Sequence, residues 1–140
     1  MALSPVRHVP YEAKTVNIRV YSYEGMNIVG AINNTELKTD YAFSNLTEMV
    51  FQIESILDNL QFPQVTFDLR TFDDQKKTSN YHFTTDENSS KKTIASFRLN
   101  VMYRQNASWQ GDIFYIDENK TAKFRSLLEL IHLLDSVLRK

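Results

Sequence analysis

An internal repeat is the feature that most constrains how this chain can fold. Residues 16–57 align with residues 97–138 at a constant offset of 81, without a gap over 42 positions. Eight aligned positions are identical: Val20/Val101, Gly30/Gly111, Ile32/Ile113, Phe43/Phe124, Leu46/Leu127, Glu48/Glu129, Ser55/Ser136 and Leu57/Leu138. Such self-similarity predicts two copies of one structural unit.

Each copy is predicted to run strand, turn, strand, helix. In residues 16–21, and again in 97–104, apolar and polar side chains alternate, which is typical of a strand with one face on the core. We expect the second strands at about 28–33 and 109–116. A glycine shared by both copies falls inside these strands, where glycine often marks a bulge or a close backbone approach.

The helices follow from apolar spacing at helical period. The two stripes are Leu46, Met49, Val50, Ile53 and Leu57, and Leu127, Leu130, Ile131, Leu134 and Leu138. Phe62-Pro63 is expected to stop the first helix. Thr47 and Gln52 of the first copy become Leu128 and Leu133 in the second, which widens its apolar arc. These two leucines are therefore expected either deep in the monomer or in an interface with a partner.

The predicted fold is an α+β domain in which two duplicated ββα units are related by a pseudo-twofold axis. Their hairpins would form a four-stranded, mainly antiparallel sheet with two helices on one face. We expect one domain over residues 1–140, with a tail at 1–14 and repeats at 15–60 and 94–140. The connecting segment 61–93 is expected to hold a mobile loop at about 73–92, and residues 65–72 could add an edge strand.

Composition narrows the classes of function. The net charge of −1 gives no bulk electrostatic case for nucleic-acid or membrane binding. The absence of cysteine excludes disulfides and thiolate metal sites. No apolar run approaches a membrane span, and the N-terminus resembles no signal peptide, so we expect a cytoplasmic protein. The five Asn-x-Ser/Thr sequons, at Asn33, Asn45, Asn88, Asn106 and Asn119, are then a by-product of composition.

No catalytic or metal-binding constellation emerges. Glu48 and Glu129 each follow a capping residue by three positions, which predicts a capping role rather than catalysis. His8, His82 and His132 lack the spacing of metal ligands. We therefore expect a protein that is not an enzyme and that needs no metal or cofactor.

The sheet face away from the helices is the first candidate for binding. It is expected to carry Arg19, Tyr21, Tyr23, Arg98, Met102 and Arg104. Basic and aromatic side chains on an open sheet can stack single-stranded bases and contact phosphates. The alternative is a face that contacts protein or is simply solvated.

The segment RQNASWQG, residues 104–111, contains the only tryptophan. The repeat aligns Trp109 with Ile28, which predicts a strand start after a polar turn. Trp109 is therefore expected as a core or interface anchor, with an exposed ligand-binding tryptophan as the alternative.

RQNASWQG, followed by FRSLLELIHLLDS, resembles a phrase found in an uncharacterised family of small proteins from clostridia-like, Gram-positive bacteria. There it follows a part resembling VNIRVYSYEGMNIVGAI and a segment resembling FSNLTEMVFQIESILDNLQFPQ. The resemblance covers most of the chain and implies a bacterial cytoplasmic setting. It implies no activity or site residue.

Together these patterns predict a small non-enzymatic binding or regulatory module that acts through protein contacts. A homodimer through Leu128 and Leu133, or a place in a larger assembly, is one form of this hypothesis. The alternative is binding of RNA or another single-stranded nucleic acid on the open sheet face.

Overall fold

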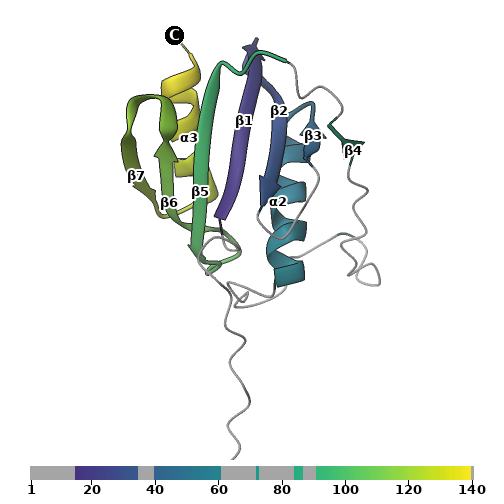
Figure 1. Ribbon diagram of the computed structural model, residues 1–140. Coiled ribbons are helices and arrows are strands. Elements are labelled where there is room, and N and C mark those ends of the chain that lie inside the picture. The colour runs from purple at the N-terminus through teal and green to yellow at the C-terminus, as the bar shows by residue number, and fades with distance from the viewer. Residues whose placement is uncertain (1–14, 35–39, 61–71, 73–83, 87–90, 140) are drawn as a thin grey trace, which may run out of the picture.

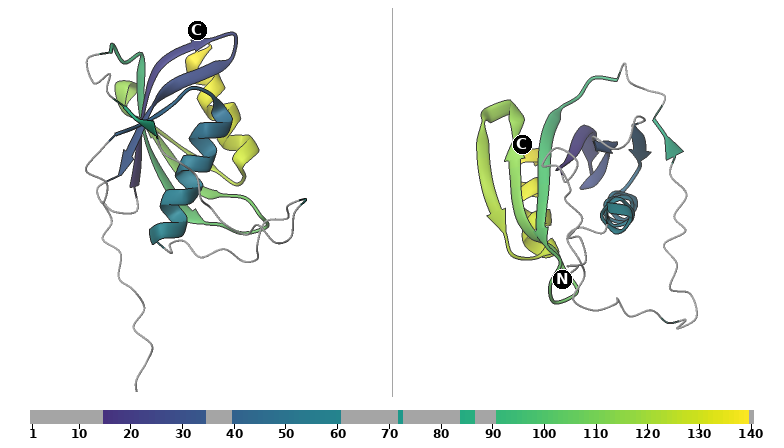
Figure 2. Two further views of the ribbon diagram at one scale, coloured as in Figure 1. Left: turned by 90° about the vertical axis from the view of Figure 1, so that its right-hand side faces the viewer. Right: turned by 60° about the horizontal axis from the view of Figure 1, so that its bottom comes forward.

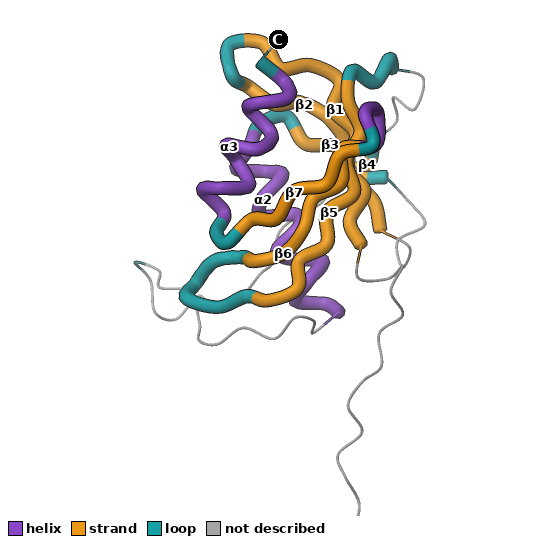
Figure 3. The backbone as a smooth tube through the Cα atoms, turned by 90° about the vertical axis from the view of Figure 1, so that its left-hand side faces the viewer, coloured by secondary structure: helices purple, strands orange, loops and turns teal. Residues whose placement is uncertain are grey.

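The protein is a two-layer structure in which a single antiparallel sheet carries both helices on one face (Figures 1 and 3). The computed structural model describes residues 15–34, 40–60, 72, 84–86 and 91–139. The sheet order is β4-β3-β2-β1-β5-β6-β7, with every neighbouring pair antiparallel. Figure 2 shows that neither described helix lies over the opposite face of the sheet, which we call the uncovered face.

The two halves of the chain contribute the same order of elements. The first half contains β1 (Thr15–Glu24), β2 (Asn27–Asn34), β3 (Tyr41–Phe43) and α2 (Leu46–Leu60). The second contains β5 (Ala95–Tyr103), β6 (Gln110–Tyr115), the 3-10 turn η1 (Ile116–Glu118), β7 (Lys120–Phe124) and α3 (Leu127–Leu138). Between them lies the two-residue β4 (Thr84–Thr85).

The α+β class is correct, but the predicted four-stranded sheet of two ββα units is wrong. Each half places a third strand, β3 or β7, between its hairpin and its helix, and β4 extends the sheet further. β3, with three residues, is too short to show a period-two pattern, and in β7 the polar Lys120 on the same face as Ala122 and Phe124 breaks the alternation. They form because β2 and β6 offer them a sheet edge with which to pair.

Strand register repeats between the halves. Val20 lies opposite Gly30 and Val101 opposite Gly111, and a bulge follows each valine. A Cβ on Gly30 would lie 2.0 Å from the carbonyl oxygen of Arg19, and one on Gly111 would lie 2.0 Å from that of Asn100. Each glycine is therefore required by close backbone approach beside the bulge.

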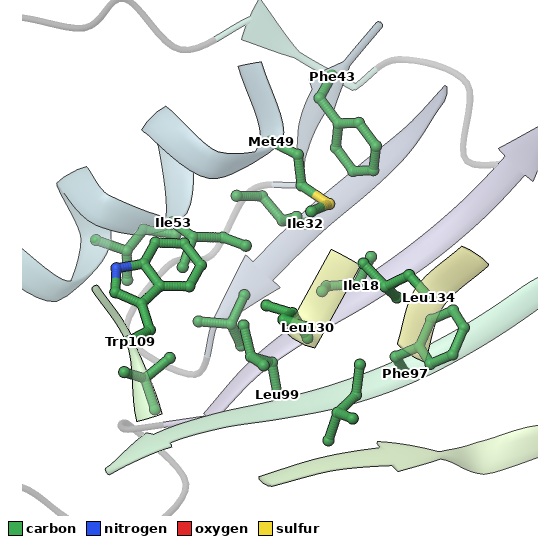
Figure 4. Close-up of a cluster of buried hydrophobic side chains, with 14 of the residues drawn as sticks. Ile18, Ile32, Phe43, Met49, Ile53, Phe97, Leu99, Trp109, Leu130 and Leu134 are labelled. Atoms are coloured by element: carbon green, nitrogen blue, oxygen red, sulfur yellow. The ribbon is translucent and has the colours of Figure 1, made fainter. Parts of the chain in front are cut away.

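The core fills the space between sheet and helices (Figure 4). Val16, Ile18 and Val20 of β1 are fully buried on the helix side of the sheet. They pack with residues of both helices, including Ile53 and Leu130, which have no exposed surface. At about 25 cal/mol per Å² of apolar area removed from water, this continuous core stabilises both halves as one unit.

Both helices begin with side-chain caps. The backbone N–H of Glu48 donates to Asn45 Oδ1 at 2.8 Å, and that of Glu129 donates to Ser126 Oγ at 3.2 Å. The two glutamates reach back as predicted, but to the backbone N–H one residue before the cap, in Ser44 and Arg125. Glu48 and Glu129 are therefore structural residues at the helix N-termini.

The connecting segment is described only in part. Thr84 and Thr85 were expected in a mobile loop, but they pair with Ala42 and Tyr41 as strand β4. The expected tail at 1–14 lies outside the described residues, as does nearly all of the possible strand at 65–72.

Candidate functional site

The uncovered face of the sheet carries an exposed group of basic, aromatic and apolar side chains in the second half of the chain. We call it the Arg98 patch: Arg98, Met102, Phe114 and Lys123. Arg98 lies opposite Phe114 between β5 and β6, and its guanidinium carbon stands 5.7 Å from the centre of the phenyl ring. Met102 is 42% exposed. Directly opposite residues of antiparallel strands share a face, so Arg98 and Phe114 lie on one surface, and Lys123, opposite Asp112 of the same face of β6, lies on it as well.

The first half of the same face is occupied by a network of its own side chains. Arg19 forms ion pairs with Asp40 and, at 3.5 Å, with Asp86, whose side chain is only 1% exposed. Tyr21 donates its hydroxyl hydrogen bond to Asp86 at 2.6 Å, and Asn33 donates to Asp40 at 2.9 Å. Arg19 and Tyr21 thus lie on the expected face but already have partners within the protein.

Tyr21 titrates far from the ordinary range. Burial and the hydrogen bond to Asp86 raise the pKa of Tyr21 to about 12, and the positive charge of Arg19 opposes this shift. Lys91 Nζ lies 5.7 Å from the centre of the tyrosine ring. The folded state therefore keeps the Tyr21 hydroxyl neutral further into the alkaline range than an ordinary tyrosine, as a donor to Asp86.

Tyr23 and Arg104 do not lie on the uncovered face, and that prediction is wrong. Each follows the bulge of its strand, in β1 and directly after β5. A bulge adds one residue and so reverses which side of the sheet the following side chains occupy. Both side chains instead contact the helices.

Arg104 lies in a buried cluster that also contains Trp109. The arginine side chain is 3% exposed and pairs with Glu54 Oε1 at 3.2 Å and with Asp58 Oδ1 at 2.7 Å. Trp109 Nε1 donates to the same Glu54 oxygen at 2.9 Å, and the residue is 4% exposed. Trp109 therefore occupies the core position that its alignment with Ile28 predicts, rather than a binding surface.

Tyr23 forms the corresponding contact in the other half. Its hydroxyl donates to Asp135 Oδ1 at 2.7 Å. That hydrogen bond and the one from Arg139 hold the pKa of Asp135 below its usual range, and burial raises the pKa of Tyr23. Tyr23 and Arg104, like Glu54 and Asp135, stand 81 residues apart. Each half thus anchors its strand end on the helix of the other half.

The two leucines that widen the apolar arc of α3 have different surroundings. Leu128 is 64% exposed in the first turn. Leu133 is partly buried and forms one wall of a pocket between α3 and the outer strands β6 and β7. Neither lies deep in the core, so the homodimer interface expected at these residues stays a prediction.

The described residues offer no metal site. No group of three or more His, Asp or Glu side chains among them could hold a metal ion. His132 is exposed on α3, and His8 and His82 lie outside the described residues.

Sequence reasoning missed several residues of this face. Lys123 was missed because the sequence does not predict β7. Phe114 was missed because the side chains of the predicted strand at 109–116 were not divided between the two faces of the sheet. Asp40 and Asp86 stand just outside strands, in segments without periodicity. Once β6 is recognised, the alternation of Asp112 and Phe114 with buried Ile113 is the signal that assigns them to the uncovered face.

These features define a two-layer α+β protein with one uncovered face of an antiparallel sheet. Comparison with protein-family models, curated proteins and solved structures finds no match for the chain. Among the residues that the structure describes, no helix is long and apolar enough to cross a membrane.

Proposed function

We propose that the chain is a non-enzymatic module that binds another protein through the Arg98 patch. The observation that carries this proposal is that Arg98 and Phe114 are presented together on the face that no described helix covers, with Met102 exposed further along β5. Arginine, methionine and aromatic side chains are enriched in protein interfaces, and the flexible methionine side chain adapts its shape to a partner.

The sheet beneath the patch is suited to binding without rearrangement. Leu99 and Ile113 lie on its helix side and are almost fully buried, so the strands that carry Arg98 and Phe114 are held by the core. A rigid backbone leaves no loop to be ordered when a partner binds, which lowers the entropic cost of association. The patch thus starts close to its bound geometry.

Binding of RNA or single-stranded nucleic acid is supported less well. Arg104 is buried with two carboxylates, and Arg19 is held by Asp40 and Asp86. Four carboxylates thus face cations that were expected to contact phosphates. Arg98, Lys123 and Lys91 remain among the described residues; Asp112 lies opposite Lys123, and Lys91 stands over the Tyr21 ring.

The partner is either another protein or a second copy of the chain. We propose the cytoplasm as the place of action, in keeping with the absence of cysteine.

Affinity capture with matched variants tests this proposal. The tagged full-length chain is incubated with lysate of its source organism, and bound protein and RNA are both identified. Arg98→Glu and Phe114→Ala should each lose the captured protein, whereas Asn59→Glu, an exposed position on α2, should retain it. Sedimentation of the purified chain reports whether the partner is a second copy.

Two results would overturn the proposal. One is capture that neither patch variant alters. The other is salt-sensitive capture of RNA that Arg98→Glu abolishes, which would favour the nucleic-acid alternative instead.

A further inference from the structure

The two halves differ in whether a further strand pairs with their third strand. On the first half, β4 pairs with β3, with Thr84 opposite Ala42 and Thr85 opposite Tyr41. On the second half, β7 pairs with β6, and no described strand lies along its other edge. A strand edge of this kind is a template for a further strand.

The register shows that these edges are equivalent. Phe43 lies opposite Gly30 in the first half, and Phe124 lies opposite Gly111 in the second. Ala122 and Lys123 of β7 therefore occupy the places of Tyr41 and Ala42 of β3. The outer edge of β7 corresponds to the edge that β4 occupies, so the fold itself contains one example of antiparallel strand addition at this position.

A pocket lies beside the outer edge of β7. Its volume is about 320 Å³, and it lies between β6, β7 and α3. Phe97 and Tyr115, stacked with ring centres 5.2 Å apart, line it together with Ala122, Leu133 and Val137. The walls are mainly apolar, as in sites that take an aromatic or aliphatic group.

The repeat explains one wall of this pocket. Tyr41 packs partly against the core in the first half, whereas its counterpart Ala122 has only a methyl group. Gln52, the counterpart of Leu133, is buried and donates to the carbonyl oxygen of Ala42 at 2.7 Å. The second half therefore has space and an apolar wall where the first has an aromatic ring and a polar contact.

The charge along the outer edge of β7 indicates which kind of strand can pair with it. Lys120 and Lys123 are exposed on β7. Lys120 pairs with Glu118 at 3.0 Å, and Asp112 lies opposite Lys123 on the inner side, so on the outer edge Lys123 is the cation that a further strand would meet. Antiparallel pairing of β7 with β7 of a second copy would bring like charges together in the registers that place Lys123 opposite Lys123 or Lys120, which destabilises strand pairing there. An acidic strand from a different protein would pair with Lys123 favourably.

We infer that β7 accepts an extended acidic segment of a partner protein as an additional antiparallel strand, whose aromatic side chain opposite Ala122 enters the pocket. Opposite residues share a face, so the residue paired with Ala122 projects to the pocket side and the one paired with Lys123 to the uncovered face. This site is separate from the Arg98 patch and goes beyond the proposed function.

A random nine-residue peptide library displayed on phage is the probe, with the full-length chain as target. Selected peptides should contain an aromatic residue flanked by acidic ones. Ala122→Tyr places a tyrosine ring of the chain itself in the pocket, where the aromatic side chain of the peptide would enter. This variant should weaken peptide binding at least tenfold, measured by calorimetry. Thr47→Tyr, which adds the same side chain at an exposed position of α2, should leave it unchanged.

A second variant distinguishes loss of the pocket from misfolding of the chain. Leu133→Gln introduces the residue of the other half, keeps nearly the same size and makes one wall polar, so it should also weaken binding. Melting temperatures of all variants show whether each is folded. Arg98→Glu should not affect the peptides, so failure at one site is distinguishable from failure at the other.

The inference is overturned if the library yields no binder. It is equally overturned if the selected peptides bind folded Ala122→Tyr and Leu133→Gln as tightly as the unaltered chain.

Discussion

Asn17 and Arg98 lie directly opposite each other where β1 pairs with β5, and they stand 81 residues apart. They are therefore the same position in the two halves, and the axis that relates the halves passes between them. Across this axis, Tyr23 bonds to Asp135 on α3, and Arg104 and Trp109 bond to Glu54 on α2. These crossed contacts join the halves, because each strand end bonds to the helix of the other half.

Loss of Glu54 should be the most costly change in these crossed contacts. Glu54→Ala removes one of the two carboxylates that pair with buried Arg104 among the described residues, and leaves the indole N–H of Trp109 without this acceptor. We expect the free energy of unfolding to fall by about 2–3 kcal/mol, since buried charges and donors that lose a partner are destabilising. Urea unfolding, followed by circular dichroism, measures the change.

Asp58→Ala is the matched control for this prediction. Its carboxylate contacts the same arginine at 2.7 Å, but the side chain is 39% exposed and does not bond to Trp109. We expect a loss of about 1 kcal/mol, as for partly solvated ion pairs. Equal losses in the two variants would contradict the central position of Glu54.

The elements that the sequence predicted are those with enough residues to show a period. The helices appeared in the spacing of Leu46 to Leu57 and of Leu127 to Leu138, and β1 and β5 appeared in their alternation. β3 spans three residues and β7 five, and their pairing depends on the neighbouring strands. The strand count was therefore wrong although the α+β class was correct.

The candidate site was harder to predict because a bulge changes the face of single side chains. The shared glycines indicated a bulge or close approach, but not which residues of the partner strand would be displaced. Tyr23 and Arg104 consequently seemed to face outward with Tyr21 and Arg98. The partners of Arg19, Asp40 and Asp86, come from segments that only the folded chain brings to β1.

Gly111→Ala should be strongly destabilising. The added Cβ would meet the backbone oxygen of Asn100 at 2.0 Å, so a strand must shift. We expect a loss of roughly 3 kcal/mol in the free energy of unfolding, the upper end of overpacking costs.

Gly25→Ala provides the comparison for Gly111→Ala. Gly25 has φ +61°, and no atom lies within 4 Å of the place that the Cβ of an alanine would take. Only the left-handed backbone conformation therefore opposes alanine at this position. A loss of about 1 kcal/mol is expected there. Thermal unfolding of both variants checks the order, which would be contradicted if Gly25→Ala were the more damaging.

Acid should destabilise the protein through Glu129. Hydrogen bonds from the Arg125 guanidinium and backbone N–H lower the pKa of Glu129 from 4.5 to about 2. A lowered folded-state pKa contributes stability that is complete above the unfolded value and is lost as pH falls toward the folded value. Urea unfolding between these pH values should therefore show a smaller decline in Glu129→Gln than in the unaltered chain. An identical decline would mean that other carboxylates, such as Asp135, account for it.

Alkaline titration should report the contact between Tyr21 and Asp86. The neutral tyrosine is favoured in the folded state, so its contribution to stability is complete below pH 10.0 and is lost as pH rises through about 12. Asp86→Asn keeps an acceptor but removes the negative charge that opposes phenolate formation. The pKa of Tyr21 should then fall below 12 while burial keeps it above the ordinary value. Ultraviolet absorbance of tyrosinate measures this, with Tyr21→Phe identifying the residue's own transition. Asp112→Asn, on the same face of β6, should leave the titration unchanged, and an equal shift there would exclude a specific role for Asp86.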